Sequence, residues 1–180
     1  LKECLPILES CVVEPVEHPS ESRKLIFDSR CGQHRLIVTR SADVLTYVEQ
    51  GVADVGITGK DTILEYGGGM SFYERLDLKI GLCRMMTAAP VGFVVPSGAL
   101  RVASKFVNIA RGHYHSQGCQ VELIKLTGAM EIAPVLGLAD CIVDIVDTGN
   151  TLRANGLEAM DVICDVITRV IVNRSSMKTK

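Results

Sequence analysis

The sequence lacks an excess of either charge. Its 19 Lys and Arg residues and 21 Asp and Glu residues leave a formal net charge of −2, and the pI is near 6.1. This balance provides no global basic field of the kind that attracts proteins to nucleic acid. Nucleic acid is therefore not an expected partner, and any anionic ligand must be held by local donors.

The sequence also lacks long apolar runs and paired cysteines. No apolar run approaches the ~20 residues needed to cross a bilayer, and no basic stretch followed by an apolar one opens the chain. The seven cysteines are scattered, form no CxxC pair, and have no histidine at zinc spacing. These features predict a cytoplasmic protein with reduced thiols and no membrane association.

Two common nucleotide-binding motifs are missing as well. The sequence contains neither GxxxxGK nor GxGxxG, which argues against a P-loop enzyme or a dinucleotide-binding enzyme. No internal repeat or low-complexity segment is found. With 180 residues and 47% hydrophobic content, the chain can form one domain or two small lobes.

The hydrophobic pattern alternates between strands and helices. Strands are expected at 22–27, 34–39, 52–58, 102–104, 121–126, 141–146 and 166–172. Helices are expected at 41–50 and 106–117, from Gly59 and Ala129 onward, and at the opening leucines Leu1, Leu5 and Leu8. This alternation predicts an α/β fold with mainly parallel sheets, in which ligands sit beyond the carboxyl ends of strands. The Pro- and Gly-rich segment 90–99 is the expected crossover between lobes.

The strongest candidate site follows the apolar segment Cys141–Val146. Gly149, in the sequence Asp147-Thr148-Gly149-Asn150-Thr151, permits a tight turn into a helix whose first amides lack intrahelical partners. Such a turn is suited to an anion, and the two threonine hydroxyls add donors. The alternative interpretation is that Thr148 or Asn150 only caps the helix.

Two aspartates distinguish this turn from a plain phosphate site. Asp144 and Asp147 would repel a phosphate, so their presence predicts hydroxyls or a metal beside it. A phosphorylated ribose meets this requirement, because its hydroxyls would donate to a carboxylate. A carboxylate would also stabilise positive charge on the sugar as a leaving group departs. The turn therefore fits a phosphoribosyl donor.

A longer pattern around the turn resembles the motif of the ATP phosphoribosyltransferase family. It comprises Glu131, Gly137-Leu138-Ala139, Ile142-Val143-Asp144-Ile145 and Thr148-Gly149-Asn150-Thr151-Leu152. The resemblance continues through Ala42-Asp43-Val44, Ala53-Asp54-Val55-Gly56-Ile57, Gly59-Lys60-Asp61, Val102-Ala103-Ser104-Lys105 and Ile171-Val172-Asn173-Arg174. Two departures are Leu45, where the family has proline, and Thr127, where an aromatic is common.

The resemblance implies a reaction and a fold. The family transfers phosphoribose from phosphoribosyl pyrophosphate to N1 of ATP and releases pyrophosphate with inversion, as the first step of histidine biosynthesis. Its core resembles a type II periplasmic binding protein, with two lobes and an active site in the cleft between them. We accordingly expect lobe I at 1–89 plus 165–180 and lobe II at 90–164. The rival hypothesis is a non-catalytic small-molecule binding module of the same architecture.

The resemblance also assigns residues. Donor binding is expected at Asp144, Asp147, Thr148, Gly149, Asn150, Thr151 and Leu152, with Arg23, Arg40 and Asp144 as catalytic residues. ATP and pyrophosphate are expected at Arg23, Arg40, Lys60 and Glu131, because arginine has a permanent charge and a fork that matches phosphate. The alternatives are surface ion pairs for the arginines, a solvated lysine, and a helix-dipole role for Glu131.

The expected cofactor and partners come from the same resemblance. Mg²⁺ would accompany the pyrophosphate, and no organic cofactor is expected. Because the sequence stops at Lys180, the short form of the family is favoured, which implies a homodimer bound to a regulatory subunit resembling a histidyl-tRNA synthetase. The Lys-Gly-Arg turn that normally precedes the family's residues matching Leu1-Lys2-Glu3 is absent from the sequence.

Overall fold

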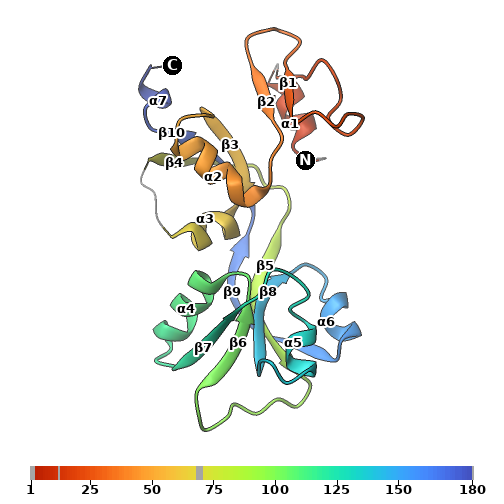
Figure 1. Ribbon diagram of the computed structural model, residues 1–180, viewed down its shortest axis with the longest axis vertical. Helices are drawn as coiled ribbons and strands as arrows, with labels where there is room; N and C mark the ends of the chain where they lie inside the picture. The colour runs from red at the N-terminus through yellow and green to blue at the C-terminus, as the bar shows by residue number, and fades with distance from the viewer. Residues whose placement is uncertain (1–2, 12, 68–70, 180) are drawn as a thin grey trace. The chain divides into compact units, whose positions relative to one another are not determined.

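The computed structural model divides into two compact units (Figure 1). The structure describes residues 3–11, 13–67 and 71–179. Unit 1 takes in the described parts of 1–58, 70–80 and 169–180, and unit 2 takes in those of 59–69 and 81–168. Each unit is therefore built from segments that are separated in the sequence.

Unit 1 contains two small sheets. Its elements are α1 (Leu5–Ser10), β1 (Ile26–Asp28), β2 (Arg35–Ile37), α2 (Ser41–Glu49), β3 (Val55–Gly59), β4 (Phe72–Asp77), β10 (Thr168–Asn173) and α7 (Ser176–Thr179). Strands β1 and β2 form an antiparallel pair, and a second sheet has the order β3-β10-β4.

Helix α2 packs closely on the second sheet of unit 1. Its residues Leu45 and Val48 are fully buried, as is Ile171 of β10. A Cβ atom at Gly56 of β3 would lie only 2.6 Å from a methyl group of Val44. The absence of a side chain at Gly56 is what allows this approach of helix and strand.

Unit 2 is a five-stranded sheet flanked by helices. Its elements are α3 (Lys60–Tyr66), β5 (Cys83–Pro90), β6 (Leu100–Ser104), α4 (Val107–Ser116), β7 (Val121–Lys125), α5 (Ile132–Val135), β8 (Cys141–Val146), α6 (Asn150–Ala154) and β9 (Leu157–Val166). The strand order is β7-β6-β8-β5-β9. Strands β7, β6 and β8 are parallel, whereas β5 is antiparallel to both β8 and β9.

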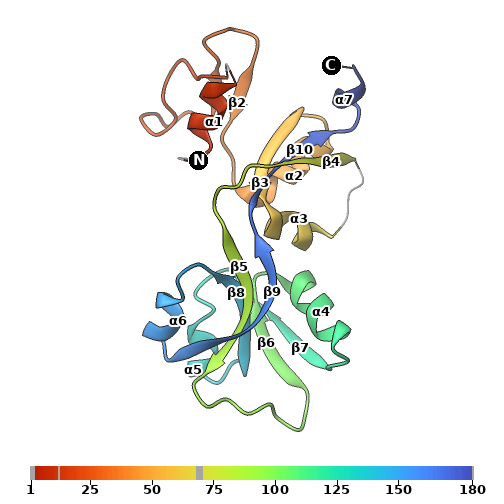
Figure 2. The ribbon, with the colours of Figure 1, turned by 180° about the vertical axis from the view of Figure 1, so that it is seen from behind.

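The two faces of this sheet carry separate cores, because side chains alternate between faces along each strand. One core includes Met85, Phe106 and Tyr114 and lies beneath α4. The other includes Met86, Ala133 and Leu152 and lies beneath α5 and α6. Helix α4 is on one side of the sheet and α5 and α6 are on the other, as opposite views show (Figures 1 and 2).

Hydrogen bonds of Glu65 join helix α3 to α4 within unit 2. The carboxylate of Glu65 accepts hydrogen bonds from the backbone N–H groups of Asn108 at 2.9 Å and Ile109 at 3.2 Å. The Asn108 side chain donates in return to the carbonyl of Glu65 at 2.8 Å. Glu65 thereby satisfies two amides at the start of α4 that have no partner inside the helix.

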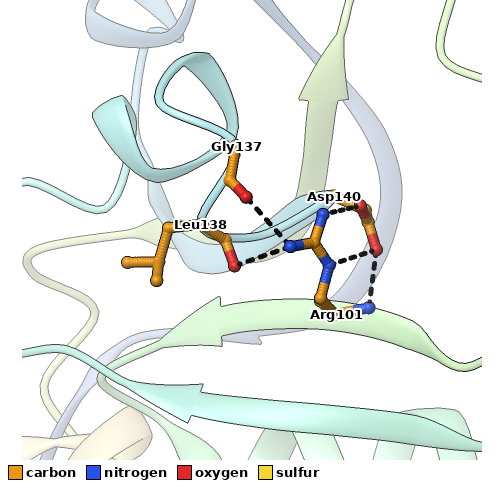
Figure 3. Close-up of polar contacts among 4 residues, drawn as sticks. All are labelled: Arg101, Gly137, Leu138 and Asp140. Atoms are coloured by element: carbon orange, nitrogen blue, oxygen red, sulfur yellow. Dashed lines mark hydrogen bonds and ion pairs between the residues drawn. The ribbon is translucent and has the colours of Figure 1, made fainter.

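An arginine joins the start of β6 to the loop before β8 (Figure 3). The Arg101 guanidinium lies 2.6 Å from the carboxylate of Asp140 and donates to the carbonyls of Gly137 at 2.9 Å and Leu138 at 3.4 Å. The Asp140 carboxylate also accepts from the backbone N–H of Arg101 at 2.8 Å. These contacts hold the pKa of Asp140 below its usual value and fix where β8 begins.

The α/β fold is confirmed, and three of the five strands of the large sheet, β7, β6 and β8, are parallel. The expected strand 141–146 and the helix at 41–50 are found almost residue for residue. The compact units differ from the expected lobes at two segments that were expected in lobe I and belong to unit 2, the described part of 59–69 with α3 and 81–89 with most of β5. Strand β5 pairs there with β8 and β9. Leu1 and its part of the expected opening helix lie outside the described residues.

Candidate functional site

The candidate site lies where β8, the central strand of the unit 2 sheet, ends. Cys141, Ile142 and Val143 are almost fully buried, and Asp147 and Thr148 beyond the strand are exposed. The parallel neighbour β6 ends beside it, with Ser104 paired to Val143. This edge is therefore the carboxyl end of the parallel strands, the place where α/β sheets usually bind ligands.

Gly149 makes the turn that starts α6. Its φ of 72° is in the left-handed region, which glycine adopts at little cost. No side-chain hydrogen bond caps α6 at this position, although the Thr148 hydroxyl accepts a long bond from the Asn150 N–H at 3.4 Å. The first helical amides thus open toward the edge of the sheet.

Arg153 braces the turn from within α6. Its guanidinium donates to the Asn150 side-chain oxygen at 2.6 Å and to the Thr148 carbonyl at 3.1 Å. A Cβ atom at Gly149 would lie 3.3 Å from the same guanidinium, so glycine also makes room for this contact. Sequence reasoning missed Arg153, although a basic residue four positions after the turn glycine is a signal that could have revealed it.

The two aspartates of the site have different environments. Asp144 is partly buried, and burial is the main cause that raises the pKa of its carboxyl. The nearby Glu131 raises this pKa further, whereas the backbone N–H of Ile145, at 2.8 Å, and the cation of Lys105 lower it. Asp147, by contrast, is exposed.

Lys105 was also missed by the sequence analysis as a site residue. It follows Ser104 at the end of β6 and is exposed, with its ammonium 5.6 Å from the ring of Phe106. Its effect on Asp144 shows that β6 brings a positive charge to the end of β8. The signal was available, because Lys105 directly follows an apolar strand.

The structure brings together most of the expected donor-binding residues. Asp144 and residues 147–151 lie at one edge of unit 2, with Glu131 close enough to influence Asp144. Leu152 differs from the others because its side chain is 5% exposed and packs in the core beneath α6. Its side chain therefore supports the helix, and only its backbone is available to a ligand.

The remaining expected residues are distributed over both units. Lys60 is the first residue of α3 in unit 2, and its backbone N–H donates to the carbonyl of Ile167 at 2.9 Å. Arg23 and Arg40 belong to unit 1, where Arg23 precedes β1 and Arg40 precedes α2. Both arginine side chains are exposed, and neither forms an ion pair with a described residue.

Comparison with known proteins identifies the family. The sequence profile described as ATP phosphoribosyltransferase matches residues 40–180. The chain belongs to the ATP phosphoribosyltransferase family. An enzyme of that name from Pseudomonas fluorescens is 56% identical over 178 residues, which are 99% of this chain and 84% of the relative. Another, from Saccharophagus degradans, is 57% identical over 180 residues, 100% of this chain and 84% of the relative.

Solved structures agree with this assignment. The ATP phosphoribosyl transferase (HisG:HisZ) complex from Thermotoga maritima matches with a TM-score of 0.85 and 34% identity, over 99% of this chain and 85% of that one. A probable amino-acid ABC transporter extracellular-binding protein from Bacillus subtilis matches with a TM-score of 0.51 and 11% identity. The match covers 80% of this chain and 67% of that one. The second likeness shows only the fold, that of a type II periplasmic binding protein. Within the described residues no helix has both the length and the apolarity of a membrane span.

Proposed function

We propose that the chain holds phosphoribosyl pyrophosphate in the Asp147–Leu152 turn while its phosphoribosyl group passes to N1 of ATP. This is the ATP phosphoribosyltransferase reaction, the first step of histidine biosynthesis. The observation that carries the proposal is Gly149, whose φ of 72° turns the chain at the end of β8 and opens the first amides of α6. These amides and the hydroxyls of Thr148 and Thr151 would take the 5′-phosphate.

The transfer exchanges one bond at C1 of the ribose for another. The bond from C1 to the pyrophosphate oxygen breaks, and a bond from C1 to N1 of ATP forms on the opposite face, so the configuration inverts. N1 is already a nucleophile, and the bond-breaking electrons leave with pyrophosphate. Catalysis then rests on positioning and on stabilising the positive charge that develops on the ring.

We assign the two aspartates different parts in this step. Asp144 is partly buried, where the surroundings are less polar and a charge acts more strongly, so its carboxylate would stabilise the ring. Asp147 is exposed and would accept from the ribose hydroxyls. Glu131 lies near Asp144 and would contact the same sugar.

Mg²⁺ would arrive with the pyrophosphate. No group of three or more His, Cys, Asp or Glu side chains that could hold a metal ion occurs among the described residues. Asp147 nevertheless fits the ion, because Mg²⁺ is commonly held by one or two carboxylates together with substrate phosphates and water. When bound, the ion would neutralise charge on the leaving pyrophosphate.

Lys60, Arg23 and Arg40 would bind the phosphates of ATP and the departing pyrophosphate. The exposure of both guanidinium groups, and their lack of an ion pair within the described residues, supports their availability for an anionic ligand. Arginine is suited to this role because its planar fork matches phosphate oxygens and its charge is permanent.

We also propose that the active assembly is a homodimer joined to a regulatory subunit resembling a histidyl-tRNA synthetase. The Thermotoga maritima relative was solved as a HisG:HisZ complex, which supports this assembly. A cytoplasmic location is supported by the cysteines, all seven of which are free thiols in this structure.

The test is formation of phosphoribosyl-ATP from ATP, phosphoribosyl pyrophosphate and Mg²⁺, followed by chromatography and mass spectrometry. The reaction is run with and without the regulatory subunit from the same source, and we expect product in the assembled complex. Binding of both substrates without any turnover in that complex would instead support the non-catalytic binding module. The fold alone does not distinguish the two, since binding proteins share it.

A further inference from the structure

Arg84 is an unassigned cation at the edge of the sheet that carries the turn. It is the second residue of β5, and the antiparallel pairing sets it directly opposite Val146, the last residue of β8. Since β5 runs opposite to β8, the amino end of β5 lies where β8 ends. We propose that the Arg84 guanidinium binds the 5′-phosphate of phosphoribosyl pyrophosphate together with the amides of the turn.

Strand alternation places Arg84 on the same face of the sheet as α6. Directly paired residues on antiparallel strands share a face, and Val146 belongs to the core beneath α5 and α6. Met86, two residues after Arg84, belongs to that core as well, whereas Cys83 and Met85 pack in the core beneath α4. Arg84 therefore extends this face at the end where α6 begins.

The turn needs a cation from outside itself. Asp144 and Asp147 place carboxylates beside the proposed phosphate position, and they would repel the phosphate. Arg153, the cation within α6, is already bonded to Thr148 and Asn150. Arg84 is exposed and forms no ion pair with a described residue, so its charge is available.

The competing role for Arg84 is a cross-strand pair with Asp165. The two residues are in register on β5 and β9, and opposite charges at such positions attract. The pairing register between these strands shifts next to Met85, however, and no ion pair joins the two side chains. Asp165 thus leaves the guanidinium able to reach an anion.

This inference rests on the proposed function and adds Arg84 to the residues that bind phosphoribosyl pyrophosphate. The test compares Arg84→Gln with the unaltered chain by calorimetry, using phosphoribosyl pyrophosphate, ribose 5-phosphate, pyrophosphate and ATP as separate probes. Losing a charged hydrogen bond should raise the dissociation constants of the first two about tenfold or more. The affinities for pyrophosphate and ATP should stay within about twofold of the unaltered values.

Two further variants complete the experiment. Arg111→Gln removes the same charge from an exposed position on α4 and should leave every affinity unchanged. Arg84→Lys keeps the charge without the fork and should restore part of the lost affinity, which also covers the case in which Arg84→Gln does not fold. Unchanged ribose 5-phosphate affinity in Arg84→Gln, or an equal loss for pyrophosphate, would overturn this inference alone. Failure of the unaltered chain to bind phosphoribosyl pyrophosphate would instead overturn the proposed function.

Discussion

Thr148 and Thr151 carry the two hydroxyls of the turn, and both are exposed. We predict that Thr148→Ala or Thr151→Ala weakens phosphoribosyl pyrophosphate binding by ~1–2 kcal/mol, because each removes a hydrogen bond to a charged group. The measurement is the dissociation constant by calorimetry, with Thr179→Ala as a control that removes an exposed hydroxyl outside the turn. If neither variant loses affinity, the threonines serve only the helix start.

Asp144 should oppose stability while supporting catalysis. Burial raises the pKa of its carboxyl above the unfolded value, so the folded state keeps a proton that the unfolded state has already lost. The contribution of this group to folding stability therefore falls as pH rises between the two pKa values, and the whole destabilisation is present above the raised pKa. Asp144→Asn removes the ionisable carboxyl and with it this destabilisation of the folded state.

The prediction for Asp144→Asn is a higher melting temperature at neutral pH and about 100-fold lower kcat, since the stabilising carboxylate is lost. The gain in melting temperature should shrink as pH falls through the raised pKa and should vanish below the ordinary carboxyl pKa, where Asp144 is protonated in both states. Thermal unfolding across pH and steady-state kinetics provide the measurements. A variant with normal kcat would exclude Asp144 from the reaction.

At the scale of elements, the loop before β8 depends on one arginine. Arg101→Ala should lower the free energy of unfolding, because Asp140 and the carbonyls of Gly137 and Leu138 lose their donor. The pair is partly exposed, which keeps the effect below that of a buried pair. Urea unfolding measures the change, and Arg111→Ala on α4 is the matched control. Equal stability of the two variants would show that the loop before β8 does not depend on Arg101 for its stability.

The same loop should respond to acid. Arg101 lowers the pKa of Asp140, so the stability from this pair is present above the ordinary carboxyl pKa and is lost as pH falls through the lowered one. The stability difference between Arg101→Ala and the unaltered chain should therefore narrow at low pH. This acid response is opposite in sign to that of Asp144, which makes the two contributions separable.

Elements with a clean local pattern were predictable from the sequence. The apolar run of β8 and the turn at Gly149 can be recognised in the sequence, because buried strands and left-handed turns constrain residue type directly. Strands β4 and β9 were not predicted, since most of their residues are exposed and their partners are distant in the sequence. Their place in the sheets is decided by non-local pairing, which no short window contains.

The candidate site was predicted to the same limited extent. Residues that follow a strand, such as Asp147 and Thr148, were expected beyond its carboxyl end, and the structure places them, exposed, directly after β8. Their binding of a ligand stays a prediction. Arg84 lies at the start of β5, and only the antiparallel direction of this strand brings it to the end of the sheet where β8 ends. The direction of a strand is a property of the whole sheet, so Arg84 was outside the reach of sequence reasoning.

At the scale of the whole molecule, unit 2 is nearly continuous in sequence. All five strands of its sheet and both cores lie between Cys83 and Val166. We predict that a fragment spanning 81–168 folds alone and unfolds cooperatively in urea with an m-value of about 1–2 kcal/mol/M. Circular dichroism during the titration provides the measurement, and a gradual loss of signal without a transition would contradict the prediction.

The fragment lacks α3 and therefore the Glu65 contacts to α4. Glu65→Ala in the 180-residue chain isolates that loss and should lower the free energy of unfolding by about 1 kcal/mol, as for other helix-start contacts. If the fragment is much less stable than the Glu65→Ala variant, α3 stabilises unit 2 by more than the contacts of Glu65 with the start of α4.

The position of β10 between β3 and β4 has a consequence for the order of events during synthesis. All strands of the unit 2 sheet have been synthesised once Val166 is added. Strands β3 and β4 can pair only after β10, which ends at Asn173, has been synthesised as well. Chains begin to fold as they leave the ribosome, at about 5–20 residues per second. The unit that holds the turn can therefore form while the earlier-made strands of unit 1 still lack the strand that joins them.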